Sequence, residues 1–157
     1  ERLITWYSQI TGSSRVKVDC ILSEKELSPQ LCVLKEYYKS SDKMVVSLSE
    51  YINLKAPLIV PSMVELLDSQ LASRLIASAG SLSKLARMPS STIQLLGAEK
   101  ALFRHISDGS PPPKHGFLYQ HPLVKKASKK EKGRISRKLA AKVAIASKID
   151  YFGEKNE

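Results

Sequence analysis

The sequence predicts an all-α fold, in which antiparallel coiled-coil-like helices are followed by a compact helical domain. Three observations support this class. The 157 residues include only 7 glycines and 6% aromatic residues, which is few for an all-β sandwich or for a base-stacking platform. Apolar residues recur at intervals of three and four over long segments, as on one face of a helix. Glycine and proline residues separate these segments, which gives the predicted helices defined ends.

Residues 1–66 form the predicted coiled-coil region, truncated at its amino end. Residues 1–10 are typical of the end of an amphipathic helix. A new helix is expected to start at Ser23, with Glu26 in the capping-box position, or else at Pro29. The positions of a heptad seam follow in steps of four and three: Leu34, Tyr38, Ser41, Val45, Leu48 and Ile52. Such a seam packs against another helix, and an intramolecular hairpin is favoured over a homodimer through the coiled coil, which remains the alternative.

Residues 67–153 form the predicted helical domain, and residues 154–157 a tail. A helix that begins near residue 62 is expected to run to 79, because Gly80 then ends it. The remaining expected elements are a helical turn at 81–87, a helix at 92–106, a stiff proline loop at 108–113, an extended piece at 116–120 and a helix at 132–149.

The expected helix 92–106 has two different faces. One is apolar and is expected to face the core: Leu95, Leu96, Leu102, Phe103 and Ile106. The other carries small and polar residues: Gln94, Gly97, Ala98, Ala101, Arg104 and His105, with Lys100 on its flank. A glycine inside a helix costs about 1 kcal/mol relative to alanine. Gly97 therefore indicates either the close approach of a partner or tight packing inside the domain. Glu99 falls in the apolar arc and is expected to be buried, paired with an arginine or with backbone donors.

Positive charge is concentrated in one segment. The chain carries 25 Lys and Arg against 15 Asp and Glu, and residues 114–148 hold 11 of the basic residues with one acid, Glu131. This excess indicates a polyanion-binding surface, with a solvated basic face or a flexible tail as the alternative. The basic stripe on the last expected helix contains Arg134, Arg137, Lys138, Lys142 and Lys148. The stripe expected to be buried contains Ile135, Leu139, Val143, Ala146 and Ile149.

Enzyme signatures are missing from the sequence. It has no phosphate-binding glycine loop, no zinc-protease motif and no nucleophile elbow, so neither a catalytic residue nor a cofactor is expected. The two cysteines and three histidines lack zinc-site spacing. Two cysteines also fit an intracellular protein better than a disulfide framework. No apolar run is long enough for a membrane span, so no membrane partner is expected.

Several motifs, in one order along the chain, resemble the signature of the Nop domain family. They are residues 79–82 (AGSL), 87–104 (RMPSSTIQLLGAEKALFR), 113–116 (PKHG), 132–137 (KGRISR) and 149–152 (IDYF). The resemblance is dense over residues 67–153 and weaker over residues 22–66. The GAEK and ALFR segments and the PPPKHG loop look most like the archaeal scaffold of box C/D ribonucleoproteins.

The resemblance implies an RNA-binding scaffold that recognises a kink-turn RNA already bound by its small ribosomal-protein-like partner. It also implies support for guide-directed 2′-O-methylation by fibrillarin, which would be recruited only through an amino-terminal domain missing from this chain. A splicing-type kink-turn assembly factor and a nonspecific basic helical nucleic-acid-binding protein are the alternatives. The implied location is intracellular: the cytoplasm of an archaeon, or the nucleus or nucleolus of a eukaryote.

Two sets of residues are expected to form the interface. The RNA-binding set is Arg87, Ser90, Ser91, Thr92, Lys100, Arg104, Lys114, His115, Arg134, Arg137 and Lys142. The set that faces the protein–RNA partner is Gln94, Gly97, Ala98 and Ala101. In the first set the resemblance itself implies Arg87, Ser90 and His115. The helix amino terminus at 90–92 is expected to offer free N–H groups and a positive dipole end to a phosphate.

Overall fold

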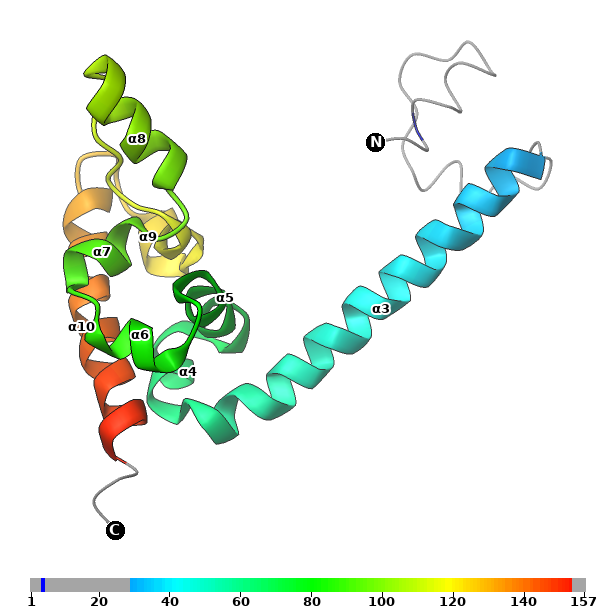
Figure 1. Cartoon of the computed structure of the whole chain (residues 1–157), viewed down its shortest axis with the longest axis horizontal. Helices are drawn as coiled ribbons and strands as arrows, with labels where there is room; N and C mark the ends of the chain where they lie inside the picture. The colour runs from blue at the N-terminus through cyan, green and yellow to red at the C-terminus, as the bar shows by residue number, and fades with distance from the viewer. Residues whose placement is uncertain (1–3, 5–28, 154–157) are drawn as a thin grey trace. The chain divides into compact units, whose positions relative to one another are not determined.

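The computed structural model describes residue 4 and residues 29–153 of the chain. The chain divides into two compact units, Glu1–Ser49 and Glu50–Glu157. Every regular element within the described ranges is a helix (Figure 1), which confirms the predicted all-α class. Within the same ranges, no helix has the length and apolar content needed to cross a membrane.

The long helix α3 spans Pro29–Ile59 and begins at the second of the two predicted starts. The first candidate start, at Ser23, lies outside the described residues. Pro57 lies inside the last turns of α3, so the helix continues past a residue that lacks an N–H group. Val45 and Leu48 of the predicted seam are 61% and 55% exposed, so no described residue covers them. The antiparallel pairing of this helix therefore stays a prediction, as does the domain division at residue 67.

The prediction of a single helix over 62–79 was wrong, because two helices occupy this segment. Helix α4 spans Pro61–Leu67 and α5 spans Ser69–Ala79. The residue between them, Asp68, has a positive φ of 86° and its side chain accepts a hydrogen bond from the Gln70 N–H at 2.8 Å. Asp68 thus ends one helix and caps the next. As predicted, Gly80 ends α5 in the left-handed conformation.

The predicted helix 92–106 is also divided. After α6 (Leu82–Arg87), helix α7 spans Ser90–Leu95 and α8 spans Glu99–Asp108. Gly97 lies between α7 and α8 with a φ of 86°, so it belongs to a turn and not to the middle of a helix. Of the apolar arc predicted to face the core, Leu96 is buried as expected. The part of the arc on α8 was wrong, because this helix buries none of its residues and both Phe103 and Ile106 are exposed. Figure 1 shows α8 projecting from the other helices of its unit.

The last elements pass from a short helical turn to the longest helix of the second unit. The extended piece predicted at 116–120 was wrong, since Phe117–Gln120 is a 3-10 helix, η1. Helices α9 (Pro122–Lys126) and α10 (Lys132–Phe152) follow. Helix α10 packs against α4, α6 and α7. The fully buried apolar side chains of this core include Met63, Leu75, Leu85, Ile93, Leu118, Val124 and Val143.

The buried face of α10 includes polar residues that the apolar pattern had left out. Leu139, Val143 and Ala146 are buried as predicted, whereas Ile149 is 54% exposed and was predicted wrongly. Asp150 occupies the core side instead. Its two carboxylate oxygens accept hydrogen bonds from the N–H groups of Ser62 at 3.0 Å and Met63 at 2.9 Å. The buried face of α10 therefore includes position 150 instead of position 149, and the Asp150 carboxylate binds the free N–H groups at the start of α4.

Candidate nucleic-acid interface

A loop is fastened to the end of α7 by backbone hydrogen bonds. The Gly116 N–H donates to the Gln94 carbonyl at 2.9 Å, and the Phe117 N–H donates to the Leu96 carbonyl at 2.8 Å. The Gln94 side chain also donates, from Nε2 to the Lys114 carbonyl at 2.7 Å. A Cβ on Gly116 would lie 1.9 Å from the Leu96 carbonyl oxygen, so only glycine permits this approach. The end of α7 therefore finds partners in the loop instead of in a further helical turn.

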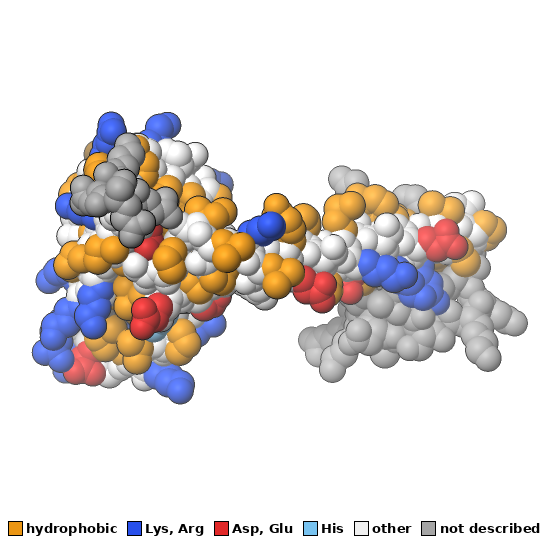
Figure 2. Space-filling view, turned by 90° about the horizontal axis from the view of Figure 1, so that it is seen from below, with side chains coloured by type: hydrophobic (Ala, Val, Ile, Leu, Met, Phe, Trp, Pro, Cys, Tyr) orange, Lys and Arg blue, Asp and Glu red, His pale blue; other side chains and the backbone are white. Residues whose placement is uncertain are grey.

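The fastened loop and the start of α10 enclose a cleft of about 580 Å³, named here the basic cleft. Its lining residues are Gln94, Pro112, Pro113, Lys114, Lys130, Gly133, Arg134 and Arg137. Four of these carry positive charge, and none is acidic. The Lys114 side chain passes over Gly133, where an added Cβ would lie 3.6 Å from its Cδ. Figure 2 shows Lys and Arg side chains gathered on the unit that contains this cleft.

Most of the cations in the basic cleft have no ion-pair partner in the described part of the chain. Arg134 forms an exposed ion pair with Glu131 at 3.2 Å, and such surface pairs contribute little free energy. Lys114, Lys130 and Arg137 form no ion pair with any residue between 29 and 153. Three unpaired cations around one concavity favour the binding of an anion with several charges, such as a phosphate backbone.

Next to the loop, an aromatic pair meets a lysine. The rings of His115 and Tyr119 lie 4.7 Å apart between centroids, at an angle of 39°. The Lys132 Nζ lies 4.7 Å from the centre of the Tyr119 ring and 3.3 Å from its Oη. A cation over a phenol ring is stabilised by the ring quadrupole. His115 belongs to the predicted RNA-binding set, but no local pattern around it predicts the contacts among its ring, Tyr119 and Lys132.

A second concavity, of about 460 Å³, follows the first turns of α8 and is named here the α8 surface. It is lined by Gly97, Ala98, Glu99, Lys100, Ala101 and Arg104. Three of the four residues predicted to face a protein–RNA partner are thus brought together. The fourth, Gln94, lies in the basic cleft instead, with its amide bound to the loop.

Glu99 was expected to be buried, which was wrong because the turn at Gly97 points α8 away from the core. The Glu99 side chain is exposed, and its Oε1 accepts the Gly97 N–H at 2.7 Å. The Glu99 carboxylate therefore does bind a backbone donor, which was one of the two partners expected for it.

Other predicted residues lie apart from the basic cleft. Arg87 is exposed at the end of α6, and Ser90 begins α7. Ser91 and Thr92 line a small apolar groove with Leu95, Leu96, Glu99 and Leu102. Because α7 has only six residues, its amino terminus is a weaker phosphate site than the long predicted helix would have provided. No group of three His, Cys, Asp or Glu side chains in the described part of the chain is placed to hold a metal ion.

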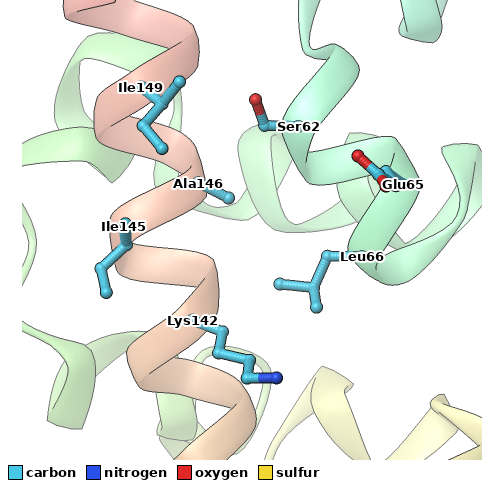
Figure 3. A pocket seen from close by; sticks show the side chains of 7 residues that line it. All are labelled: Ser62, Glu65, Leu66, Lys142, Ile145, Ala146 and Ile149. Carbon is cyan, nitrogen blue, oxygen red and sulfur yellow. The ribbon is translucent and has the colours of Figure 1, made fainter.

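Lys142, the last predicted RNA-binding residue, lies in a groove between α4 and α10 (Figure 3). The groove, of about 360 Å³, is lined by Ser62, Glu65, Leu66, Lys142, Ile145, Ala146 and Ile149. It is mainly apolar, with one acid and one base, so its charge does not favour a polyanion. The structure therefore separates Lys142 from the four cations of the basic cleft.

The fold and the cleft define a class of protein: a domain that is helical throughout its described residues and carries a cationic cleft on its surface. A family model described as "Nop: snoRNA binding domain, fibrillarin" matches residues 7–157. The chain belongs to the Nop family, which confirms the family predicted from its motifs.

Relatives with this domain occur in archaea and eukaryotes. A NOP5 family protein of Methanocaldococcus jannaschii is 45% identical over 117 residues, which are 74% of this chain and 27% of that protein. Nucleolar protein 56 of Homo sapiens is 46% identical over 123 residues, 74% of this chain and 21% of the relative. Nucleolar protein 58 of Candida albicans is 38% identical over 149 residues, 95% and 29% of the two chains. The chain thus spans less than a third of these curated relatives.

One solved structure extends the likeness to three dimensions. A chain in the crystal structure of a fibrillarin/Nop5p complex matches with a TM-score of 0.65 and 30% sequence identity. The match covers 96% of this chain and 58% of the other.

Proposed function

We propose that this domain is a non-catalytic scaffold that binds a kink-turn RNA together with the small protein already bound to that RNA. The observation that carries the proposal is the basic cleft, in which Lys114, Lys130 and Arg137 form no ion pair with a described residue. The loop that walls this cleft is fastened to α7, directly before the turn that leads into the α8 surface. A single ligand with both an RNA part and a protein part would meet the two surfaces together.

The chemistry of the basic cleft suits phosphates more than base edges. Lysine and arginine side chains position a nucleic-acid backbone, and their contacts release counterions, so affinity falls steeply with salt. The cleft lining includes no aromatic residue. The neighbouring Tyr119 ring already contacts Lys132 and His115. A free single strand, which binds mainly through stacking, is therefore expected to be a poor ligand.

The α8 surface suits a protein that approaches closely. Gly97, Ala98 and Ala101 have little or no side chain, so a partner backbone fits against them, while Lys100 and Arg104 reach around it. The same helix exposes Phe103 and Ile106, at 69% and 71%. Exposed large apolar side chains on a helix with no buried residue favour a protein partner over solvent.

The wider role proposed is in box C/D ribonucleoproteins, where fibrillarin carries out guide-directed 2′-O-methylation. This proposal is supported by membership of the Nop family and by the Nop5p chain solved with fibrillarin. Recruitment of fibrillarin would need sequence outside the Nop domain, and catalysis would belong to fibrillarin. An intracellular location follows from the same proposal: nucleolar in a eukaryote, cytoplasmic in an archaeon.

The test is a titration of the whole chain with three ligands: a kink-turn RNA, its small binding protein, and the preformed complex of the two. The complex is expected to bind much more tightly than either component, because it presents both surfaces in a fixed geometry. Lys114→Ala with Arg137→Ala is expected to lower the log–log salt slope by about two units, one for each phosphate contact removed. The matched control is Lys39→Ala with Lys43→Ala on α3, which is expected to leave the slope unchanged.

Equal affinity for naked RNA and for the complex would refute composite recognition and would favour a nonspecific basic protein. An unchanged salt slope in the cleft variant would show that these cations are merely solvated. Preference for a spliceosomal kink-turn complex over a box C/D complex would move the assignment to the splicing-type factor.

A further inference from the structure

Helix α8 is held less firmly by its unit than the other long helix, α10. It buries no residue, so the core does not hold it in place. At its end, Gly109 adopts the left-handed conformation, and the His105 Nδ1 lies within hydrogen-bonding distance of the Ser110 carbonyl oxygen. At its start stands the turn at Gly97, whose φ is 86°. The direction of α8 therefore depends on a few backbone torsions and on whatever restrains them.

Two side chains restrain the turn: Glu99, which accepts the Gly97 N–H, and Phe117 of η1, which comes from another element. A Cβ added to Gly97 would lie 2.6 Å from two atoms of the Phe117 ring, so the ring rests directly on the glycine backbone. Phe117 is itself held in place: its ring packs against the buried core, and its backbone N–H donates to the Leu96 carbonyl beside the turn. A ring fixed at its base and pressed against a glycine leaves that turn little freedom to rotate.

A cation from another helix completes the arrangement. The Arg74 guanidinium, on α5, lies over the Phe117 ring at 5.8 Å from its centroid. Its Nη1 also donates to Gln120 Oε1 at 2.9 Å, at the other end of η1. Arg74 thus ties η1 to α5 at two points. Neither Arg74 nor Phe117 lines the basic cleft or the α8 surface.

We propose that Arg74, Phe117 and Gly97 form a latch that sets the direction of α8 relative to the basic cleft. On this proposal, which rests on the proposed function, Arg74 and Phe117 are positioning residues for recognition of the RNA–protein complex. They act through the α8 surface and touch neither ligand.

The geometry explains why such a latch matters. Helix α8 has 10 residues and is therefore about 15 Å long, so a 20° swing at its base moves its far end by about 5 Å. A displacement of this size would prevent one rigid ligand from reaching the cleft and the α8 surface together. Binding of naked RNA uses the cleft alone and would not depend on the direction of α8.

The first measurement is a distance distribution between spin labels at Ser107 on α8 and Lys138 on α10, with Cys20 and Cys32 replaced by serine. The unaltered latch is expected to give one narrow distribution. Arg74→Gln and Phe117→Leu are expected to broaden it, whereas Lys84→Gln, an exposed cation on α6, serves as the matched control. Arg74 is exposed, so its variant is expected to fold even where Phe117→Leu does not.

The second measurement repeats the titrations with Arg74→Gln. Affinity for the kink-turn RNA bound to its small protein is expected to fall about tenfold, which corresponds to about 1.4 kcal/mol of lost preorganisation. Affinity for the naked RNA and the unfolding midpoint are expected to stay unchanged, which a merely destabilising change would not produce.

The outcomes separate the latch from the proposed function. Unchanged distance distributions in Arg74→Gln and Phe117→Leu would overturn the latch. Broadened distributions with full affinity for the complex would overturn the positioning role. A wild-type domain that shows no preference for the complex would defeat the proposed function, while the distances would still decide whether the latch exists.

Discussion

Replacing Asp150 by asparagine tests how α10 is locked to the rest of its unit. Asp150 is 5% exposed, and its carboxylate accepts two backbone hydrogen bonds, from Ser62 at 3.0 Å and from Met63 at 2.9 Å. These donors are N–H groups of the first turn of α4, which no residue of that helix binds. One negative side chain at the end of α10 therefore completes the start of a helix 87 residues away in the sequence.

The expected loss of stability follows from these contacts. Asparagine has the same shape but only one acceptor oxygen, and its amide N–H would face the second backbone N–H. One hydrogen bond to a charged group is lost and one buried donor is left unsatisfied, each worth about 1–3 kcal/mol. Allowing for overlap between these two effects, Asp150→Asn is expected to destabilise the fold by about 2 kcal/mol. For a unit of this size the melting temperature should fall by about 8 °C.

Thermal unfolding followed by circular dichroism measures this effect directly. Asp42→Asn, at an exposed position on α3, is the matched control and is expected to change the midpoint by less than about 1 °C. A midpoint for Asp150→Asn equal to that of the control would refute the assigned role of the carboxylate, because the same charge would have been removed in both.

Three further substitutions have expected outcomes. Gly116→Ala should destabilise the domain by at least about 2 kcal/mol and weaken RNA binding, because its Cβ would lie 1.9 Å from the Leu96 carbonyl oxygen; normal stability would contradict the close approach of the loop. Asp68→Gly should stabilise the fold by about 1 kcal/mol and so raise the unfolding midpoint, since relief of a φ of 86° and ψ of 156° outweighs the lost cap; a lower midpoint would show that the cap dominates. Glu99→Gln should change stability by less than about 0.5 kcal/mol, because the exposed side chain retains an acceptor for the Gly97 N–H; a loss above 1 kcal/mol would restore the buried role first expected.

The helices with strong local signals were predicted correctly. Proline at residue 29, Gly80 and the long periodic pattern of α10 each act within a few residues, so the sequence alone predicts their effect. The break at Asp68 has a local cause, since its side chain caps α5, and was missed because the apolar pattern continues across it. The break at Gly97 was missed because its cause is not local. The turn at Gly97 depends on hydrogen bonds from residues 116–117 and on the Phe117 ring, which no window around residue 97 contains.

The candidate site was predicted in part for the same reason. The cations of α10 were found because they share one exposed helical face and lack interspersed acids. Their meeting with Lys114 in one cleft depends on the fastened loop, and the inward position of Asp150 depends on the start of α4. Contacts between distant segments supply both features, and an amphipathic pattern that places polar residues outside predicts neither.

The packing of α10 against α4, α6 and α7 has a consequence for synthesis of the protein on the ribosome. These three helices emerge early, yet the apolar faces they share with Leu139 and Val143 stay uncovered until α10 has been made. At about 5–20 residues per second, that interval lasts several seconds. During this interval the nascent chain exposes its core-forming surfaces to other polypeptides, so we expect a chaperone to bind these surfaces. Translation arrested just before residue 132 should therefore leave the nascent chain bound to a chaperone. Arrest after the whole of α10 has left the ribosome should leave a nascent chain that no chaperone binds.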